Sequence, residues 1–409
     1  MDATPHFALY AERRARVAAQ LGPGGIAVVP TAPERPRNRD SDFLYRHDSY
    51  FYYLTGFTEP NAWLVITAEG QSTLFCQPKD LEREIWDGIR LGPQAAPATL
   101  GVNEAYAVDE LDRRLPRLLE NRNAVWFPFA THEGLEGRLE GWLRQVRARV
   151  RFGALCPQTQ HDLCGVLDEM RLIKDAHELA VMRRASQISA RAHIRAMQKS
   201  AAMLRAGQDV REYHLDAELL HEFRQHGSQY PAYGSIVAAG ANACVLHYRA
   251  DAAPIRDGEL VLIDAGCELD GYASDITRTF PANGRFTGPQ RALYDLVLAS
   301  QVAAVDAGPA QVVRHPQRLD ALRQCGQRVQ VSALEISPAP SARSSAYDPG
   351  GSSIVSSPAA THAYVYARGR LRTLPTGLVL GVPTDPVALA RSEARSDIAA
   401  ISGNSATDE

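Results

Sequence analysis

The order of hydrophobic and polar positions divides roughly the first 170 residues into short strands and amphipathic helices. Apolar runs bounded by turn residues predict strands at "GGIAVVP" (24–30), "NAWLVITAEG" (61–70) and "STLFC" (72–76). The aromatic run "SYFYYLTGF" at 49–57 predicts another strand or strand end. Apolar residues at helical spacing predict helices within 109–121 and 132–149. We therefore expect one α/β domain over residues 1–172.

A long helical pattern begins near residues 165–175 and marks a second part of the chain. Its apolar positions in register are Leu172, Leu179, Met182, Ala185, Ile188, Ala192 and Met197. A second helix ends at Gly227, a residue typical of C-caps, and a third begins at Thr287. Strands are predicted between these helices at "GSIVAAG" (234–240), "CVLHYRA" (244–250), "ELVLIDAGCE" (259–268) and "YASDITRTF" (272–280). A second domain is expected over 173–310.

The pattern is lost after about residue 310. Residues 335–362 are rich in Ser, Pro, Ala and Gly, and only "TGLVLGVP" at 376–383 looks like a strand. We expect residues 311–409 to form a divergent, poorly ordered tail.

Composition narrows the classes of function. The 409 residues are 45% hydrophobic and 22% charged with a formal net charge of −3, which gives no reason to expect nucleic-acid or membrane binding. The start resembles a polar amphipathic helix rather than a signal peptide, and no apolar run approaches the ~20 residues of a membrane span. We expect a cytoplasmic protein. Its six cysteines are scattered, without a CxxC motif, and are expected to be free thiols.

The stretch "ELVLIDAGCELDGYASDITRTF" places Asp264 and Asp275 on the two arms of a predicted hairpin. A turn tip at 269–270 would set them directly opposite, whereas a tip at 270–271 would make them diagonal neighbours on one face. Two carboxylates so placed repel each other, so we expect a positive partner between them. Divalent ions are one answer, and oxygen ligands suit Mn²⁺ or Mg²⁺. Turn capping or pairing with Arg278 is the alternative.

His247 lies in a predicted strand upstream, where a lone histidine is more often a core residue than a functional one. Together with the aspartate hairpin, however, it belongs to a series of motifs that closely resembles the bacterial aminopeptidase P (Xaa-Pro aminopeptidase) family of pitta-bread metallopeptidases. These motifs include "RNRDSDFLYRHDSYFYYLTGFTEPNAWL", "EREIWDGIRLGPQAAP", "YPAYGSIVAAGANACVLHY" and "DGELVLIDAGCELDGYASDITRTFPANGRF". The resemblance runs from about residue 8 to about residue 305.

The resemblance implies an α/β N-terminal domain followed by a pitta-bread catalytic domain. It implies release of the N-terminal residue from peptides with proline at position two, with two Mn²⁺ ions as cofactor. Asp264 and Asp275 would be metal ligands, and a hydroxide between the ions would be the nucleophile. His247 would stand beside the scissile bond and steady the tetrahedral intermediate.

The resemblance also implies contacts to the substrate and between subunits. Tyr248 would be a substrate-binding residue. Trp86 and Asp40 match residues that reach a neighbouring subunit's active site, in a homo-oligomer that is a dimer or tetramer. For Trp86 the alternative is a half-buried packing aromatic.

The family's three further metal ligands come from motifs of the types "HGxxHxxGxxxHD", "EPG" and "RIED", none of which occurs in this sequence. We therefore expect a pitta-bread domain that is incomplete at its C-terminus, with a tail that is frameshifted or divergent. Two aspartates alone chelate weakly, so this chain is expected to be nearly inactive on Xaa-Pro peptides. The alternative function is then a catalytically inactive member that keeps only N-domain subunit or partner contacts.

Overall fold

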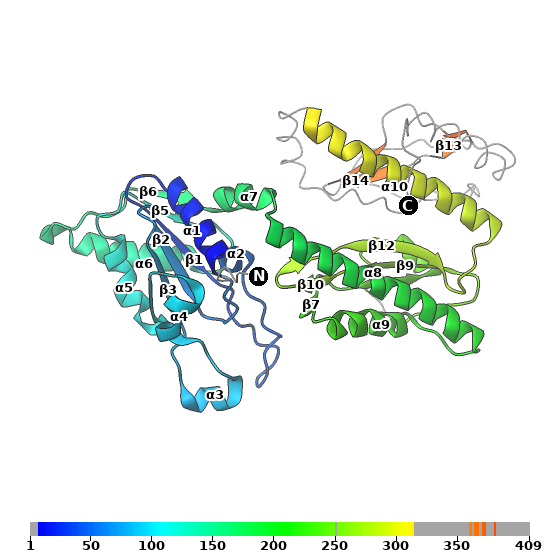
Figure 1. Ribbon diagram of the computed structural model, residues 1–409, viewed down its shortest axis with the longest axis horizontal. Coiled ribbons are helices and arrows are strands. Elements are labelled where there is room, and N and C mark those ends of the chain that lie inside the picture. Colours follow the sequence, from blue (N-terminus) through cyan, green and yellow to red (C-terminus); the bar gives the residue numbers. More distant parts are fainter. Residues whose placement is uncertain are drawn as a thin grey trace, which may run out of the picture. The chain divides into compact units, whose positions relative to one another are not determined.

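The computed structural model describes residues 7–249 and 252–314, with side chains up to residue 303, and short strands within 360–381. The chain divides into two compact units between Leu179 and Ala180. Helices and strands occur in both units, so the expected mixed α/β class is confirmed (Figure 1). The domain limits 1–172, 173–310 and 311–409 stay predictions.

A six-stranded mixed sheet forms the centre of the first unit, in the order β4-β3-β2-β1-β5-β6. β1 pairs antiparallel with β2 and parallel with β5. The strands predicted at 24–30, 61–70 and 72–76 are confirmed. The six strands are β1 (Gly25–Pro30), β2 (Trp63–Thr67), β3 (Ser72–Cys76), β4 (Glu104–Ala107), β5 (Ala124–Phe127) and β6 (Thr159–Asp162).

Helices cover both faces of this sheet. Alternate residues of β1 enter two different cores, Ala27 and Val29 into one and Ile26 and Val28 into the other. The first core includes residues of α1, α2, α4 and α7, and the second residues of α5 and α6. The helices are α1 (Ala8–Gln20), α2 (Ser49–Thr55), α3 (Leu81–Asp87), α4 (Gly92–Leu100), α5 (Leu111–Leu119), α6 (Leu135–Ala148) and α7 (Cys164–Leu172). The two helices expected within 109–121 and 132–149 are thus confirmed.

The strand predicted at 49–57 is wrong, because this segment forms helix α2. Asp48 is its N-cap and accepts a hydrogen bond from the backbone N–H of Phe51 at 2.8 Å. Gly56 ends the helix with φ 67° and donates its N–H to the carbonyl of Tyr52. Both caps satisfy backbone groups that a strand would leave to neighbouring strands, and they outweigh the β propensity of the aromatic residues.

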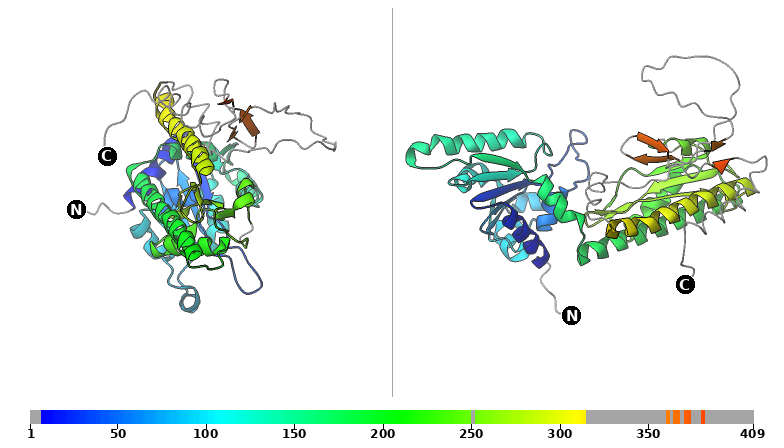
Figure 2. Two further views of the ribbon diagram at one scale, coloured as in Figure 1. Left: turned by 90° about the vertical axis from the view of Figure 1, so that its right-hand side faces the viewer. Right: turned by 90° about the horizontal axis from the view of Figure 1, so that it is seen from above.

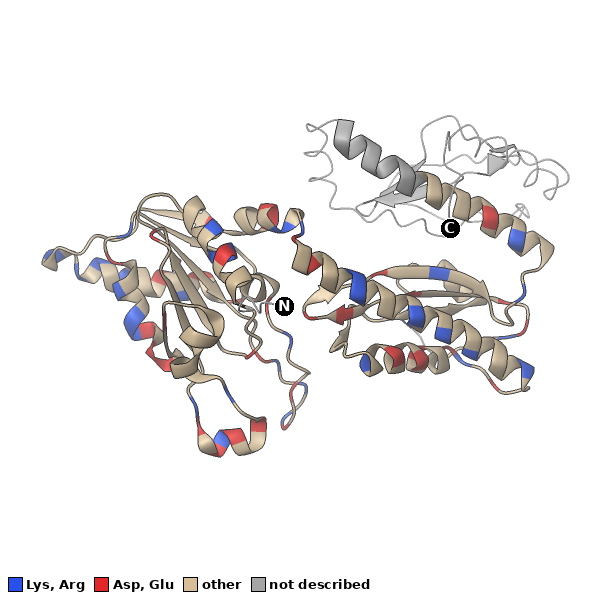
Figure 3. Ribbon diagram, viewed as in Figure 1, with Lys and Arg blue, Asp and Glu red and all other residues tan. Residues whose placement is uncertain are grey.

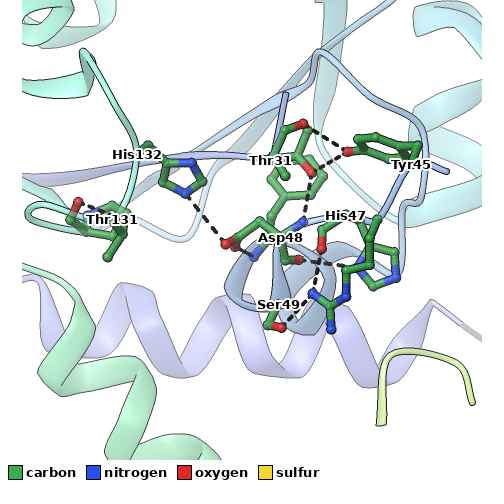
Figure 4. Close-up of polar contacts among 11 residues, drawn as sticks. Thr31, Tyr45, His47, Asp48, Ser49, Thr131 and His132 are labelled. Carbon is green, nitrogen blue, oxygen red and sulfur yellow. Dashed lines mark hydrogen bonds and ion pairs between the residues drawn. The ribbon is translucent and has the colours of Figure 1, made fainter. Parts of the chain in front are cut away.

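Figure 4 shows how the capping residue is held. The backbone N–H of Asp48 donates to Oγ1 of Thr31, which follows β1, at 3.3 Å, and that hydroxyl also lies 3.0 Å from Oη of Tyr45. The second carboxylate oxygen of Asp48 lies 3.6 Å from Nε2 of His132. Segments distant in sequence therefore meet at the start of α2.

Two three-stranded antiparallel sheets lie in the part of the second unit before residue 314, in the orders β12-β9-β8 and β11-β10-β7. The strands expected at 234–240, 259–268 and 272–280 are confirmed, although the last two are interrupted. The segment 244–250 was expected to be a strand and is not: it follows a 3-10 helix (Gly240–Cys244), and Ala250 lies outside the described residues. The strands are β7 (Tyr230–Pro231), β8 (Ile236–Ala239), β9 (Leu260–Ala265), β10 (Cys267–Leu269), β11 (Tyr272–Ala273) and β12 (Ile276–Pro281).

Helices α8 (Ala176–Arg205) and α9 (Glu212–Gln225) pack on one face of the β8–β9–β12 sheet (Figures 1 and 2). Their apolar residues share a core with alternate residues of β8 and β9. Basic positions on α8 accompany acidic positions on α9 (Figure 3), and Nε of Arg195 lies 2.5 Å from Glu218. A third helix, α10, spans Gly288–Arg314.

The long helical pattern predicted to begin near residues 165–175 is not one helix. It breaks between α7 and α8, where Ile173 is extended. Asp175 and Glu178 then exchange side-chain-to-backbone hydrogen bonds of 2.9 Å each, which is a capping box that starts α8.

The described backbone after residue 314 contains four short strands. β14 (Tyr364–Ala367) pairs with β15 (Arg370–Thr373), and β13 (Ala360–Thr361) with β16 (Leu380–Gly381). The expectation that only 376–383 resembles a strand is therefore wrong for 364–373. The strand expected at 376–383 is described in part, as β16, whereas β13 lies within the stretch 335–362 that was expected to lack a regular pattern, and α10 continues past residue 310. The remaining predictions for the tail lie outside the described residues. No helix in the described part of the chain is long and apolar enough to cross a membrane.

Candidate functional site

The hairpin that bears the two aspartates turns at Asp270–Gly271. β10 pairs with β11 through Leu269 and Tyr272, which leaves a two-residue connection. Both turn residues have positive φ, 48° and 77°, as in the type I′ turns that Asp-Gly favours. This is the second of the two turns considered from the sequence, so the aspartates are diagonal neighbours and not directly opposite.

Strand alternation separates Asp264 from the helix-packed core. Val261, Ile263 and Ala265 of β9 belong to the core shared with α8 and α9, so Asp264 points to the other face of the sheet. Asp264 lies opposite Thr277 in the ladder and is only 7% exposed, whereas Asp275 is exposed.

A kink interrupts both arms beside the aspartates, at Gly266 on one arm and at Ser274–Asp275 on the other. A Cβ atom on Gly266 would lie 1.8 Å from the carbonyl oxygen of Ser274, so the close approach of the two arms requires glycine. The carbonyl of Gly266 accepts a hydrogen bond from Ala232, which ties the kink to the segment before β8.

Buried hydroxyl groups hold the kink from the side of α8. The N–H of Cys267 donates to Oγ of Ser189 at 2.9 Å, and Oγ of Ser274 donates to the carbonyl of Cys267 at 3.0 Å. The two serine oxygens lie 2.7 Å apart. All three residues are buried. The backbone next to each aspartate is therefore fixed by the helix beneath it.

Tyr233 joins the two carboxylates. Its Oη lies 2.5 Å from Oδ1 of Asp264 and 3.0 Å from Oδ1 of Asp275, so both carboxylates converge on one point. Burial, followed by the hydrogen bond to Asp264 and the two negative charges, raises the pKa of the Tyr233 phenol far above its ordinary value. The phenol proton thus occupies the place where the sequence predicted a positive partner. Sequence reasoning did not identify Tyr233.

The convergent carboxylates fit half of a metal site. Oxygen donors of this kind are the ligands that Mn²⁺ and Mg²⁺ prefer. No group of three or more His, Cys, Asp or Glu side chains is arranged to hold a metal ion within the described residues. The described residues therefore supply two candidate ligands, Asp264 and Asp275.

His247 lies in an exposed turn between β8 and β9, not in the core strand that the sequence indicated. Its neighbour Tyr248 donates from Oη to Glu212 at 3.0 Å and accepts from Nδ2 of Asn242 at 2.8 Å. Glu212 is fully buried at the start of α9. The sequence offered no specific signal for it, since an acidic residue in a first helical turn is common.

Trp86 and Asp40 both lie on the surface of the first unit. Trp86, in α3, is 83% exposed, so its interpretation as a half-buried packing aromatic is wrong. Asp40 is exposed in a turn where its N–H donates to the side chain of Asn38. Their role at a neighbouring subunit's site stays a prediction.

Two family models match the chain. The "Aminopeptidase P, N-terminal domain" matches residues 10–126, and "Metallopeptidase family M24" matches residues 180–313. The Xaa-Pro aminopeptidase of Escherichia coli is 45% identical over 295 residues, which is 71% of this chain and 66% of the relative. Human Xaa-Pro aminopeptidase 3 is 35% identical over 69% of this chain and 55% of its own. The chain thus spans less than two thirds of the length of these relatives.

Solved structures of aminopeptidases also resemble this chain. An aminopeptidase PepP from Pseudomonas aeruginosa has a TM-score of 0.70 and 49% identity, over 73% of this chain and 66% of its own. Proline aminopeptidase P II from Yersinia pestis has a TM-score of 0.69 and 44% identity, over 72% and 67%. A zinc-substituted E. coli aminopeptidase P in complex with product has a TM-score of 0.69 and 43% identity, also over 72% and 67%. The expected N-terminal α/β and pitta-bread folds are confirmed, and the chain belongs to the aminopeptidase P family of metallopeptidases.

Proposed function

We propose that this chain is a metal-dependent Xaa-Pro aminopeptidase, which removes the N-terminal residue from peptides with proline at position two. The convergence of Asp264 and Asp275 on one point carries the proposal, because two carboxylates held together in this way suit a divalent cation. The names of the relatives support the substrate class. The alternative, an inactive member that keeps subunit contacts, gains no support from them.

Each residue of the candidate site has its own proposed role in this reaction. Asp264 and Asp275 would hold the metal, for which we propose two Mn²⁺ ions. Bound divalent ions would supply Lewis acidity, which activates water and polarises the scissile carbonyl. His247, exposed in its turn, would donate a hydrogen bond to the peptide group that is being cleaved. Tyr233 would keep the two carboxylates at a fixed separation before the metal binds.

We also propose that the protein is a cytoplasmic homo-oligomer. The exposed Trp86 and Asp40 would reach the active site of a second subunit in a homo-oligomer. Cys76 and Cys267 are free and buried, as suits a protein of the reducing cytoplasm.

The test is hydrolysis of an Ala-Pro peptide with excess Mn²⁺, together with metal analysis of the purified chain. The proposal predicts turnover of ~1 s⁻¹ or more, lost in Asp275→Asn, whereas the near-inactivity expected from the three missing ligand motifs predicts no turnover in either chain. Asp257→Asn is the matched control, because this exposed aspartate precedes β9 and bonds only to Asn283 among the described contacts. Absence of both turnover and bound metal in the parent chain would contradict the proposal and favour the inactive alternative.

A further inference from the structure

The connection between β8 and β9 is described over residues 240–249 and 252–259, and its second part bonds to the backbone at the start of α9. We call this segment the β8–β9 loop. It carries His247 and Tyr248, and its side chains Val245 and Leu246 are 54% and 51% exposed. The apex of the loop therefore has little apolar packing of its own, and other contacts must fix its position.

The buried carboxylate of Glu212 accepts four hydrogen bonds from this loop and from the last residue of β8. Oε1 of Glu212 accepts the backbone N–H of Ala239 at 2.9 Å and Nδ2 of Asn242 at 3.2 Å. Oε2 accepts Oη of Tyr248 at 3.0 Å and the backbone N–H of Ala253 at 3.3 Å. Glu212 thus binds the segment at its beginning, at its middle and near its end.

The backbone around Glu212 closes the same loop. The N–H of Glu212 donates to the carbonyl of Ala253 at 3.1 Å, and the N–H of Ile255 donates to the carbonyl of Val210 at 2.8 Å. The position of the carboxylate relative to the returning chain is therefore fixed. Because Glu212 is 0% exposed, water does not compete for its oxygens, and hydrogen bonds to a desolvated charge are among the stronger ones.

The hydroxyl of Tyr248 belongs to this arrangement. It donates to Glu212 and also accepts from Asn242, whose amide itself bonds to Glu212. The three side chains form a closed triangle of hydrogen bonds directly beside His247. Because the Tyr248 hydroxyl already bonds to Glu212 and Asn242, these contacts are an alternative to the substrate-binding role predicted for Tyr248.

We propose that Glu212 is a positioning residue for His247: its carboxylate fixes the β8–β9 loop, and Tyr248 serves as the link between Glu212 and the apex. The effect on catalysis rests on the function proposed above, whereas the effect on the loop does not. Glutamine at position 212 keeps one acceptor oxygen but turns an NH₂ group toward the N–H of Ala253, where two donors repel.

Hydrogen–deuterium exchange of peptides covering 240–249 tests the proposal without an activity assay. In Glu212→Gln we expect exchange of these amides to accelerate roughly 10- to 100-fold, as for the loss of a hydrogen bond to a charged group. Tyr248→Phe should accelerate the same amides by a smaller factor, and the double variant should not exceed Glu212→Gln alone. Glu218→Gln is the matched control, since this glutamate lies on α9 but bonds to Arg195 and Lys199 of α8.

Kinetics adds a second readout. We expect both loop variants to lower kcat on an Ala-Pro peptide more than they raise KM, because a displaced His247 acts mainly in the transition state. Unchanged exchange at 240–249 in a folded Glu212→Gln variant would overturn the proposal. So would a Tyr248→Phe variant that raises KM alone and leaves the exchange unchanged, because the hydroxyl would then contact the substrate.

Two further outcomes are also decisive. If Glu212→Gln fails to fold, the exchange rates of Tyr248→Phe against the parent chain decide the role of the loop contact. If the parent chain is inactive, the function proposed above fails, and the exchange measurements still decide whether Glu212 fixes the loop.

Discussion

Replacing Tyr233 with phenylalanine removes the hydroxyl that joins the two carboxylates and leaves the ring in place. One hydroxyl proton makes one strong hydrogen bond, and the 2.5 Å contact to the buried Asp264 is the shorter of the two. A hydrogen bond to a charged group contributes about 1.5–3 kcal/mol. We expect the free energy of unfolding of the second unit to fall by about this amount.

The unfolding free energy that Tyr233→Phe loses should decrease at high pH. The pKa of Tyr233 is raised in the folded state, mainly by burial and then by the hydrogen bond to Asp264. Above the ordinary tyrosine pKa of about 10, the unfolded chain loses this proton while the folded chain keeps it. The contribution of the hydroxyl is therefore complete below pH ~10 and declines above it. The difference between the parent chain and Tyr233→Phe should shrink in the same range.

The assay must separate the two units. All four tryptophans lie in the first unit, so tryptophan fluorescence follows that unit alone. Hydrogen exchange of α8 and β9 amides in EDTA follows the second unit without bound metal. Tyr294→Phe is the control, because the ring of Tyr294 packs on Phe286 and its hydroxyl makes no hydrogen bond that the described part of the chain shows. A Tyr233→Phe loss below ~0.5 kcal/mol, or one equal to that of the control, would refute the reasoning.

Three further substitutions have definite expected outcomes. Gly266→Ala should destabilise the second unit by about 1–3 kcal/mol or more, which is the usual cost of overpacking, because the new Cβ would clash with the carbonyl oxygen of Ser274. Hydrogen exchange of β9 amides measures this loss, and exchange rates close to those of the parent chain would contradict the prediction. Gly141→Ala, in open space on helix α6, should instead stabilise the first unit by roughly 0.5–1 kcal/mol, measured by tryptophan fluorescence in urea; a loss of stability would count against it. Arg14→Met should cost the first unit about 3 kcal/mol or more by the same measurement, and a neutral result would refute it. The guanidinium of Arg14 donates to three backbone carbonyls, those of Leu54, Leu100 and Gly101.

The sequence predicts strands where apolar runs are buried and fails where apolar residues are exposed. The runs that became β1, β2 and β3 fill the two cores of the first unit. Val245 and Leu246 gave the same signal but are half exposed in the β8–β9 loop, so the strand predicted there is absent. At 49–57 the decisive signals were Asp48 and Gly56, and they were outweighed in the prediction by aromatic β propensity.

The candidate site was only partly predictable, because some of its residues are neighbours in the sequence and others interact across long sequence separations. Asp264 and Asp275 lie on one hairpin, and the Asp-Gly pair at its tip sets the register by itself. Tyr233 and Glu212 reach their partners through the packing of separate elements, which no local pattern specifies. The hydrogen bond from Tyr233 to Asp264 spans 31 positions, and that from Tyr248 to Glu212 spans 36.

The two-residue turn at Asp270–Gly271 has a consequence for the order of folding. A hairpin closed by such a turn forms in ~1–10 μs, because little chain entropy is lost in closing it. The two carboxylates should therefore be brought together early, whereas the β8–β9 loop can be fixed only after α9 has docked on the sheet and presented Glu212. Pulse-labelled hydrogen exchange during refolding should show protection of β10 and β11 amides before those of the β8–β9 loop. In this order, the imidazole of His247 joins a carboxylate pair that has already been assembled.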